Sequence, residues 1–391
     1  MNLRLPHLFP VWIATVLPLM ADGFYVPVQA PEATGRGNAW LATADTASAV
    51  YYNAAGLTQL SSPDLVVGLY SIHLGIEADT ASGNYKNNAS WAELPQIYAA
   101  VPINDKLVAG FGVNTPFGLS TDWGSNTPFR QLAIQTDLKY VTGWAVLGYK
   151  LTDTLSVGGG LGIHYADLMM KQGISYGGTD SFEFDGTGEA LSWTLSALWK
   201  PTDEHSFGLV YRSRADFMLD GNTQNSYNPG HHTNASLDLT TPDTVAAGYS
   251  YRPCKEWVLE ANIEWVNWDS LNTLNLWQSP NSNQPVTFNW HSNFIYSLGA
   301  TRYLDDGWNV GAGYNFIENS QPNSTFNPGI SDANRHWLSM GVGRETGAFR
   351  FNFAYQYAFS NRDVTGSPHG FADGTYKSRF NGLMLNCNWK L

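Results

Sequence analysis

The most constraining feature of this sequence is a two-residue alternation of apolar and polar side chains that recurs fourteen times across residues 64–391. In the thirteenth run, Phe349 and Phe351 alternate with Arg350 and Asn352. Because successive side chains of a β-strand point to opposite faces, each run offers one face to lipid and one to water. Most runs exceed the roughly five or six residues of sandwich strands. The pattern predicts an all-β fold, a fourteen-stranded antiparallel transmembrane β-barrel, over a two-layer sandwich.

The same alternation places the strands, and their spacing sorts the connections into two kinds. We expect strands near residues 64–74, 91–102, 106–116, 135–150, 154–168, 187–200, 204–219, 235–251, 255–268, 287–304, 307–318, 334–345, 348–361 and 376–391. Short turns rich in Asp, Pro and Gly alternate with long loops, and in bacterial outer-membrane barrels the short turns face the periplasm. An even strand number therefore places both ends of the barrel in the periplasm.

Composition excludes two other classes of protein. Hydrophobic residues make up 43% and charged residues 14% of the 391, and no stretch of about twenty apolar residues follows the N-terminus, so a bundle of membrane helices is excluded. The net charge of -12 and the pI near 5.1 argue against nucleic acid as a partner. The expected location is the bacterial outer membrane.

The N-terminus differs from the rest of the chain. Arg4, an apolar core at 8–19 and Ala21 are typical of a secretory signal, which predicts a signal peptide at 1–21; a membrane anchor is the competing interpretation. Residues 22–62 are rich in Ala, Gly and Thr and show no alternation. A fourteen-stranded barrel encloses enough space to need a plug. We therefore expect residues 22–62 to form a hatch inside a barrel made by residues 63–391.

The sequence contains no GxSxG, HExxH or Walker motif, and the acids among glycines at 180–189 are the one segment that offers loose calcium binding as an alternative. Cys254 and Cys387 fall in hairpins about six strands apart, and neither lies in a CxxC spacing, so we expect free thiols and no metal. We expect no enzyme and no cofactor. Two rivals stay open, a general porin for polar solutes and an outer-membrane lipid-modifying barrel enzyme with Ser, His and an acid on its outer face.

Short segments in a fixed order give the chain a family resemblance. They are Gly35-Arg36-Gly37-Asn38-Ala39, Ala44-Asp45-Thr46-Ala47-Ser48-Ala49, Asn53-Ala54-Ala55-Gly56-Leu57, Asn114-Thr115-Pro116-Phe117-Gly118-Leu119-Ser120-Thr121, Tyr211-Arg212-Ser213-Arg214, Trp265-Val266-Asn267-Trp268 and Asp332-Ala333-Asn334-Arg335-His336-Trp337-Leu338. Over essentially the whole mature length, the chain resembles the FadL-type outer-membrane transporters of long-chain fatty acids and aromatic hydrocarbons. The family's hatch usually carries Asn-Pro-Ala where this chain has Asn53, Ala54 and Ala55, so a proline-fixed turn is lost and Asn53 alone would keep the contact with the wall.

The resemblance implies passive transport of hydrophobic small molecules, either long-chain fatty acids or aromatic hydrocarbons. A substrate would land among the outer loops, enter a pocket bounded by the hatch, and leave sideways through a kink in an early strand. Burial of each methylene is worth about 0.8 kcal/mol, which favours exit into lipid over water. Other expected partners are outer-membrane lipid, including lipopolysaccharide, and the barrel-assembly machinery, whose signal the apolar alternation ending at Leu391 resembles. We expect a monomer.

The strand kink and one long loop supply two candidate sites. We place the kink in the third strand, where Gly110 and Gly112 lack side chains and Pro116 lacks an N–H, although the glycines would also serve to relieve crowding. The second long loop carries four apolar residues that either catch substrate or pack over the barrel mouth, Leu119, Trp123, Phe129 and Leu132.

The pocket itself is assigned partly by resemblance. Phe24 and Tyr25, close to the expected cleavage site, would reach into the lumen and line it. A carboxylate in an apolar pocket needs a cation, and the candidates on strand positions expected to face the lumen are Arg212, Arg214 and Lys139. Their alternative role is to neutralise acids inside a polar barrel. A neutral aromatic hydrocarbon stays equally open as substrate.

Overall fold

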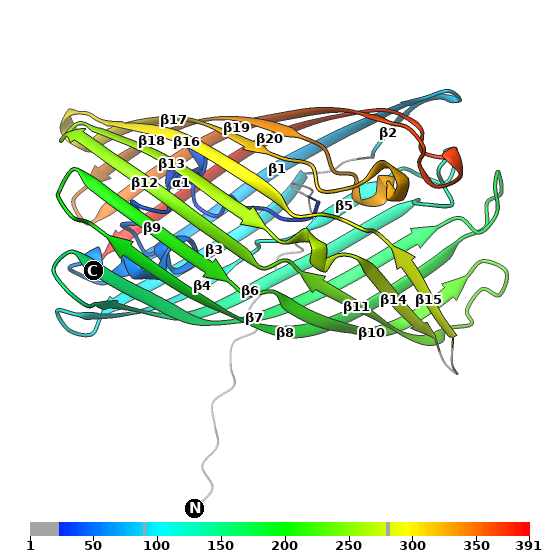
Figure 1. Cartoon of the computed structure of the whole chain (residues 1–391), viewed down its shortest axis with the longest axis horizontal. Helices are drawn as coiled ribbons and strands as arrows, with labels where there is room; N and C mark the ends of the chain where they lie inside the picture. The colour runs from blue at the N-terminus through cyan, green and yellow to red at the C-terminus, as the bar shows by residue number, and fades with distance from the viewer. Residues whose placement is uncertain (1–22, 89–90, 279–281) are drawn as a thin grey trace, which may run out of the picture.

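The computed structural model describes residues 23–88, 91–278 and 282–391, so the predicted signal peptide and Asp22 lie outside the described residues. One antiparallel sheet closes on itself, and its strands slant around a common axis (Figure 1). Closure joins β1 (Asp64–Thr80) to β20 (Gly374–Lys390) from Asp64 opposite Lys390 to Thr80 opposite Gly374. Among the described residues, no helix is long and apolar enough to cross a membrane.

The wall is crossed fourteen times, which confirms the predicted fold class. Nine crossings are single strands: β1, β3 (Trp91–Pro102), β6 (Gln135–Lys150), β7 (Leu155–Gln172), β8 (Phe182–Trp199), β17 (Trp308–Ile317), β18 (Arg335–Thr346), β19 (Phe349–Val364) and β20. Five crossings are split in two: β4 (Leu107–Asn114) with β5 (Leu119–Asp122), β9 (His205–Arg212) with β10 (Ala215–Asn225), β11 (Thr233–Thr241) with β12 (Thr244–Cys254), β13 (Trp257–Val266) with β14 (Thr273–Gln278), and β15 (Ser282–Thr287) with β16 (Asn293–Tyr303). The short β2 (Gly83–Lys86) only extends a hairpin on β1.

The two ends of the barrel differ as the connections predict. Short turns and the C-terminus gather at one end, and the long loops gather at the other (Figure 1). Single-turn 3-10 helices lie in these connections: η3 (Asp305–Gly307), η4 (Asn323–Thr325), η5 (Pro328–Ile330) and η6 (Pro368–Gly370). A further one, η2 (Trp268–Ser270), lies within a crossing, between β13 and β14. The short-turn end corresponds to the periplasmic end of outer-membrane barrels.

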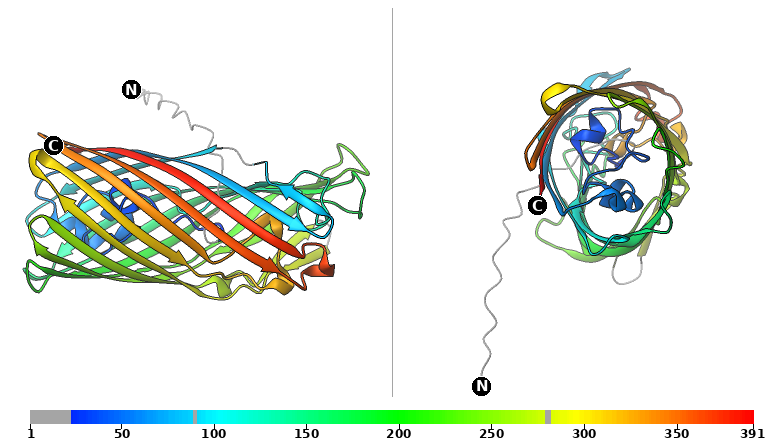
Figure 2. Two further views of the ribbon diagram at one scale, coloured as in Figure 1. Left: turned by 90° about the horizontal axis from the view of Figure 1, so that it is seen from above. Right: turned by 90° about the vertical axis from the view of Figure 1, so that its left-hand side faces the viewer.

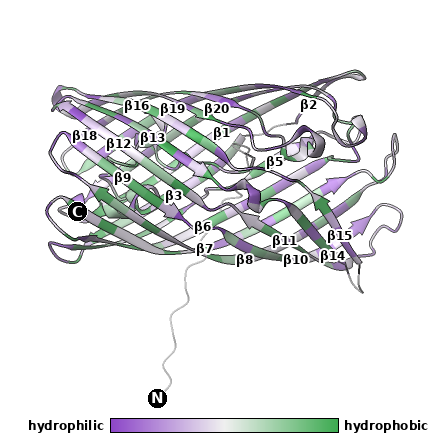
Figure 3. Cartoon of the chain, in the orientation of Figure 1, coloured by the Kyte–Doolittle hydropathy of each residue, from purple (hydrophilic) through white to green (hydrophobic). Residues whose placement is uncertain are grey.

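Along the strands, hydrophobic and hydrophilic residues alternate (Figure 3), and exposed positions alternate with buried ones. On β19, Phe349 and Phe351 are exposed on the outer face, whereas Asn352 and Gln356 are buried inside. Asn352 donates to Asn386 Oδ1 on β20 at 2.8 Å, so the polar inner groups satisfy one another across strands. An outer face of this kind belongs in hydrocarbon.

Residues 23–62, which we call the hatch, lie inside the barrel (Figure 2). The hatch contains α1 (Pro31–Thr34), α2 (Ala49–Tyr52) and the 3-10 helix η1 (Ala54–Gln59). Helix α1 contacts β18, β19 and β20, whereas η1 contacts β4, β6, β7 and β8, so the hatch spans the lumen from one wall to the other.

Glycines on the inner wall let the hatch backbone approach closely. A Cβ added at any of these positions would come within 3.0 Å of a hatch atom: Gly110, Gly148, Gly158, Gly208, Gly299, Gly313 and Gly341. We call this set the glycine belt. At Gly313 the added Cβ would lie 2.1 Å from the Arg36 carbonyl carbon, so no other side chain fits without moving the hatch. The belt sets the position of the hatch by shape.

Buried polar contacts fasten the hatch to the same wall. Arg36 pairs with Glu260 on β13 at 2.6 Å, and both side chains are almost wholly buried. Glu260 also accepts hydrogen bonds from the Ala42 N–H at 2.8 Å and from the Thr43 hydroxyl at 2.5 Å. Asn53 donates to the Ala197 carbonyl on β8 at 3.2 Å, so this residue contacts the wall although no proline follows it.

Candidate functional site

The third crossing of the wall, β4 followed by β5, is interrupted at residues 115–118. On β3, residues 97–102 pair with β4, whereas residues 91–96 pair only with β1 among the described strands. Beyond the interruption, Asn88 N–H donates to the Asp122 carbonyl at 2.7 Å. Strand pairing between β3 and the third crossing is therefore missing over a bounded stretch, which we call the window.

Of the three residues predicted to cause a kink, only Pro116 lies in the interruption. A proline has no N–H to donate to a neighbouring strand, which fits this position. Gly110 and Gly112 lie instead in the regular part of β4, paired with Ala100 and Tyr98. A Cβ at Gly110 would meet Leu57 and Val50 of the hatch at 2.7 Å. These glycines relieve crowding, which is the alternative stated for them above.

The N-terminal end of the hatch supplies the hydrogen bonds that the interruption leaves open. Val26 N–H donates to the Pro116 carbonyl at 2.8 Å, and Gly118 N–H donates to the Phe24 carbonyl at 2.8 Å. The Gln29 side chain donates to the Thr115 carbonyl at 3.0 Å and accepts from the Thr115 N–H at 3.3 Å. The first residues of the hatch thus run beside the window from the inside.

Phe24 and Tyr25 lie in an aromatic cluster at the centre of the lumen. The cluster, defined here, comprises Phe24, Tyr25, Phe117, Tyr140, Phe217, Trp268 and Trp290. Phe24 lies 5.0 Å from Trp268 and 5.8 Å from Phe117 between ring centroids, the latter in the interruption itself. An apolar region therefore extends from the aromatic cluster to the window.

Of the three predicted lumen cations, only Arg212 faces inward, and its donors are already used. Arg212 pairs with Glu264 at 3.5 Å, donates to the Tyr51 carbonyl at 2.6 Å and lies 4.5 Å from the Tyr51 ring. Glu264 also accepts a hydrogen bond from the Tyr25 hydroxyl at 3.0 Å. This arrangement fixes Tyr25 and the hatch. It corresponds to the alternative role given above, in which the cation neutralises an acid inside the barrel.

The other two predicted cations face outward. The break at residues 213–214 shifts the alternation by one residue, because Arg212 faces inward on β9 whereas Ala215 does so on β10. Arg214 consequently lies on the outer face, where it pairs with Asp216 at 3.2 Å. Lys139 shares the outward face of β6 and pairs with Asp167 at 3.2 Å. Near the loop end the wall extends beyond hydrocarbon, so outward charges are tolerated there.

Three of the four apolar loop residues close the mouth of the barrel. Leu119, Trp123 and Phe129 are at least 95% buried, and Trp123 Nε1 donates to the Pro328 carbonyl at 2.9 Å. Trp123 also packs edge-on against Phe129, with ring centroids 5.2 Å apart. Leu132 differs, because it is partly buried and lines a separate pocket.

Arg130 of the same loop holds a neighbouring loop in place. Its side chain is buried and pairs with Asp180 at 3.0 Å. Hydrogen bonds donated by Ser175, then by the Tyr227 hydroxyl and Arg130, hold the pKa of the Asp180 carboxyl well below its usual range. The loops over the mouth therefore form a connected cover.

The pocket that Leu132 lines lies near the loop end, and the sequence alone did not single it out. We call it the outer pocket; its cavity volume is about 70 Å³. Its apolar lining comprises Leu132, Met170, Phe182, Phe184, Leu237, Leu274, Leu276, Val286, Phe288 and Ile330. A lining of this polarity suits a hydrophobic ligand. The available signal was apolar residues on inward positions of β8, β11 and β14, where a barrel lumen is usually polar.

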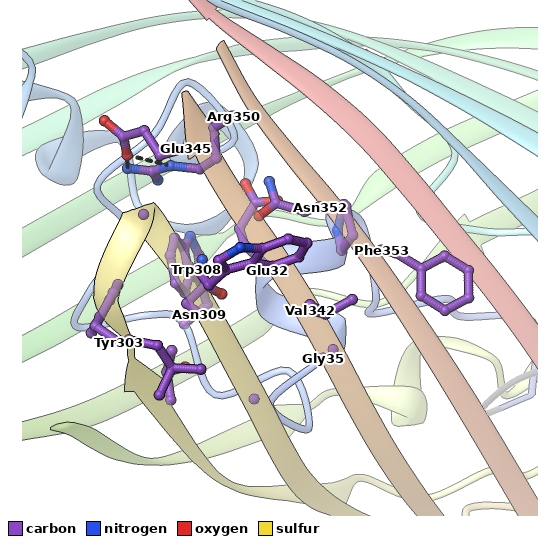
Figure 4. A pocket seen from close by; sticks show the side chains of 17 residues that line it. Glu32, Gly35, Tyr303, Trp308, Asn309, Val342, Glu345, Arg350, Asn352 and Phe353 are labelled. Carbon is purple, nitrogen blue, oxygen red and sulfur yellow. Dashed lines mark hydrogen bonds and ion pairs between the residues drawn. The ribbon is translucent and has the colours of Figure 1, made fainter. Parts of the chain in front are cut away.

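A further cavity lies near the short-turn end, between α1 and the strands β16 to β19 (Figure 4). Glu345 and Arg350 form an ion pair of 2.8 Å at its edge, and Glu32 of α1 also lines it. Toward the centre of the barrel the hatch backbone at 35–37 rests on the glycine belt. The charged side chains Glu32, Glu345 and Arg350 share this lining with apolar ones, whereas the outer pocket has one charged lining residue, Lys171. We therefore take the region between the outer pocket and the window as the candidate hydrophobic site.

Comparison with known proteins identifies similar chains. The sequence model of the family described as "Outer membrane protein transport protein (OMPP1/FadL/TodX)" matches residues 13–380. A long-chain fatty acid transport protein of Escherichia coli O6:H1 is 23% identical over 353 residues, covering 77% of this chain and 78% of its own length. Outer membrane protein P1 of Haemophilus influenzae is 21% identical over 305 residues, covering 68% of this chain and 66% of its own length.

Solved structures agree on the fold. A FadL homologue from Pseudomonas aeruginosa superposes with a TM-score of 0.85 at 19% identity, covering 94% of this chain and 99% of the other. The toluene transporter TodX of Pseudomonas putida superposes with a TM-score of 0.77 at 14% identity, covering 95% of this chain and all of the other.

Proposed function

Because the chain belongs to the outer-membrane transport protein family OMPP1/FadL/TodX, we propose that it carries hydrophobic small molecules passively across the bacterial outer membrane and releases them sideways through the window. Similar proteins are named as transporters of long-chain fatty acids and of toluene. The substrate class proposed here therefore includes long-chain fatty acids and aromatic hydrocarbons.

The observation that carries lateral release is the missing pairing between β3 and the third crossing. Pairing is also missing at residues 188–193 of β8, which pair with neither β9 nor β10, but the window differs because the first residues of the hatch run beside it. At the window, the aromatic cluster reaches the wall through Phe117 without a strand partner on β3. A hydrophobic molecule gains about 0.8 kcal/mol per methylene that stays out of water, so passage into lipid is favoured over passage past the polar short-turn end.

Entry is proposed from the loop end through the outer pocket. Ile330 lines this pocket and belongs to the same continuous apolar core as Phe24 and Phe117. A substrate would move along this core toward the window while the hatch blocks the direct route to the periplasm. The hatch acts as a fixed floor, because the glycine belt and the Arg36–Glu260 pair hold it against the wall.

Two rival functions receive less support. A general porin needs an open aqueous lumen, whereas the hatch and the mouth loops fill this one. A lipid-modifying enzyme needs an acid beside its Ser and His. His164 does bond Ser192 Oγ at 2.6 Å, but its other ring nitrogen meets the hydroxyls of Tyr140 and Thr142, and the group faces the lumen. We therefore propose no enzymatic activity.

Blocking the window tests lateral release. Ala92 is buried on the inner face of β3 beside the window, and Ala92→Trp fills that space. Ala166 is equally buried on β7, which pairs with strands on both sides, so Ala166→Trp is the matched control. Cells that depend on this protein should lose uptake of radiolabelled oleate with Ala92→Trp and keep it with Ala166→Trp. Equal uptake by the two variants would contradict lateral release.

A further inference from the structure

The outward-facing cations near the loop end differ between two sides of the barrel. On the side formed by β6 to β10 they have acids beside them: Lys139 pairs with Asp167 at 3.2 Å, and Arg214 is paired in the same way. On β20, Lys377 and Arg379 are exposed on the outer face, and neither side chain has an ion-pair or hydrogen-bond partner among the described residues. Positive charge is therefore unpaired on the β20 side.

The register places Arg379 at the level where the apolar band of the barrel ends. A band about 25 Å tall, crossed by strands tilted about 40° that rise about 3.4 Å per residue, takes up about ten residues of each strand. Counting back that far along β20 from Trp389, the exposed aromatic residue at the short-turn end, reaches Arg379. Arg379 also lies opposite Phe359, which lies opposite His336, in one outer row. Aromatic rows of this kind mark the boundary between hydrocarbon and lipid head groups.

A second row of charges lies one step farther toward the loop end. Lys377 lies opposite Glu77 on β1, and Glu77 lies opposite Lys86 on β2, with which it forms an ion pair of 2.9 Å. The acids Asp79 and Asp363 lie one row beyond these. In the two rows at head-group level, Lys and Arg side chains thus outnumber the single carboxylate. This excess of positive charge favours an anionic partner.

The wall leaves room for such a partner beside Arg379. Gly75 is the residue of β1 opposite Arg379, and the nearest heavy atom that an added Cβ would meet is the Arg379 carbonyl oxygen at 3.8 Å. Two residues along β1, His73 lies against Trp91 of β3 with ring centroids 5.4 Å apart. The outer face therefore has an open notch at Gly75, bordered by aromatic rings on the side of the hydrocarbon and by cations on the side of the loops.

We propose that Arg379, Lys377 and Lys86 bind the phosphate groups of a glycolipid of the outer leaflet, lipopolysaccharide, whose acyl chains lie along the apolar outer face of β20 and β1. These strands run side by side over the whole height of the wall (Figure 2). Arginine offers paired donors to a phosphate, and lysine adds a point charge. A phospholipid of the inner leaflet does not reach this level, because the cations lie at the loop end. The site does not depend on what the barrel transports.

Chelation followed by native mass spectrometry tests the site. Divalent cations bridge the phosphates of neighbouring glycolipids, so EDTA and detergent exchange should remove loosely associated lipid and spare lipid that Lys and Arg hold. The full chain purified in this way should carry bound glycolipid, and the double variant Lys377→Gln/Arg379→Gln should not. Lys139→Gln/Arg214→Gln removes the same two charges on the side where acids pair with them, so it should keep the lipid.

Titration with defined lipids identifies the occupant. The wild type should bind lipid A with both phosphates about tenfold or more tightly than dephosphorylated lipid A, because charge-assisted hydrogen bonds are lost. The double variant should bind the two lipids equally, and Arg379→Lys, which keeps the charge, should lose less.

Heat-modifiable migration on gels shows whether each variant has folded, and Arg379→Gln alone provides the same test if the double variant has not. Equal retention of glycolipid by the wild type and the folded variant, or equal binding of the two forms of lipid A by the wild type, would overturn the site. Tighter binding of phosphatidylglycerol than of lipid A would also overturn it, because the occupant would then be a phospholipid.

Discussion

Removing the charge of Arg36 should release the hatch from the wall. In Arg36→Gln the Glu260 carboxylate stays buried and loses its ion pair of 2.6 Å, while the Ala42 N–H and the Thr43 hydroxyl still donate to it. Breaking a buried pair by removing one partner costs about 3–5 kcal/mol. If this cost falls on docking of the hatch, the opening equilibrium rises by roughly two to four orders of magnitude.

Hydrogen exchange of the hatch amides, measured by mass spectrometry in lipid nanodiscs, reports that equilibrium directly. The peptide around Ala42 should exchange faster in Arg36→Gln, and peptides from the barrel strands should not change. Lys86→Gln is the matched control, because the Lys86–Glu77 pair of 2.9 Å is solvent-exposed and such pairs contribute at most about 1 kcal/mol. Replacing both Arg36 and Glu260 by Met should restore much of the protection, since no unpaired charge is left. Unchanged exchange in Arg36→Gln would refute the view that this pair anchors the hatch.

Three further predictions concern the belt, the loops and the orientation. Gly313→Val places a side chain where its Cβ would lie 2.1 Å from the hatch backbone, so ion conductance in planar bilayers should rise; wild-type conductance would count against the belt. Because the pKa of Asp180 is depressed, its contacts are present above the ordinary carboxyl range and are lost as pH falls below it. Asp180→Asn should therefore expose the loop at 173–181 to proteases at pH 7, whereas wild-type protein at pH 5 should stay resistant. Equal resistance of variant and wild type at pH 7 would argue against the view that the contacts of Asp180 hold this loop. Cys254, exposed at the short-turn end, should react with a membrane-impermeant maleimide only after the outer membrane is permeabilised, and labelling of intact cells would reverse the proposed orientation.

The strand pattern could be predicted from the sequence because the alternation of apolar and polar residues depends only on neighbouring positions in the chain. Aromatic side chains such as Phe349 and Phe351 identify the lipid face without knowledge of their neighbours. The short turns then give the hairpins and the two ends. For the same reason, a segment without alternation, residues 22–62, was recognisable as different from the wall.

The sequence did not predict which face of the wall a side chain lies on where a strand is interrupted. The prediction that Arg214 shares the inner face with Arg212 assumed an uninterrupted strand, and the break at residues 213–214 reverses the alternation. Lys139 was likewise predicted to occupy a strand position that faces the lumen. The sequence does not reveal that this part of β6 lies near the loop end, where Asp167 pairs with it.

Contacts between segments that are far apart in the chain also could not be predicted from the sequence. Gly110 is explained by Val50 and Leu57, which lie more than fifty residues earlier in the chain, so a kink and close packing were indistinguishable beforehand. Arg335 was not among the predicted lumen cations, because its unused donors become apparent only when Asp332 and the strands around it are in place. The outer pocket likewise gathers residues from seven separate stretches of the chain.

Photo-crosslinking of a diazirine-tagged palmitic acid in outer-membrane vesicles tests the central claim most directly, because it records the path of the substrate. Mass-spectrometric mapping should find adducts on residues beside the window, such as Leu94 and Phe117, and these adducts should disappear in Ala92→Trp. Adducts confined to the short-turn end, at residues such as Gln59 and Asp203, would show passage past the hatch into the periplasm and would contradict release through the wall.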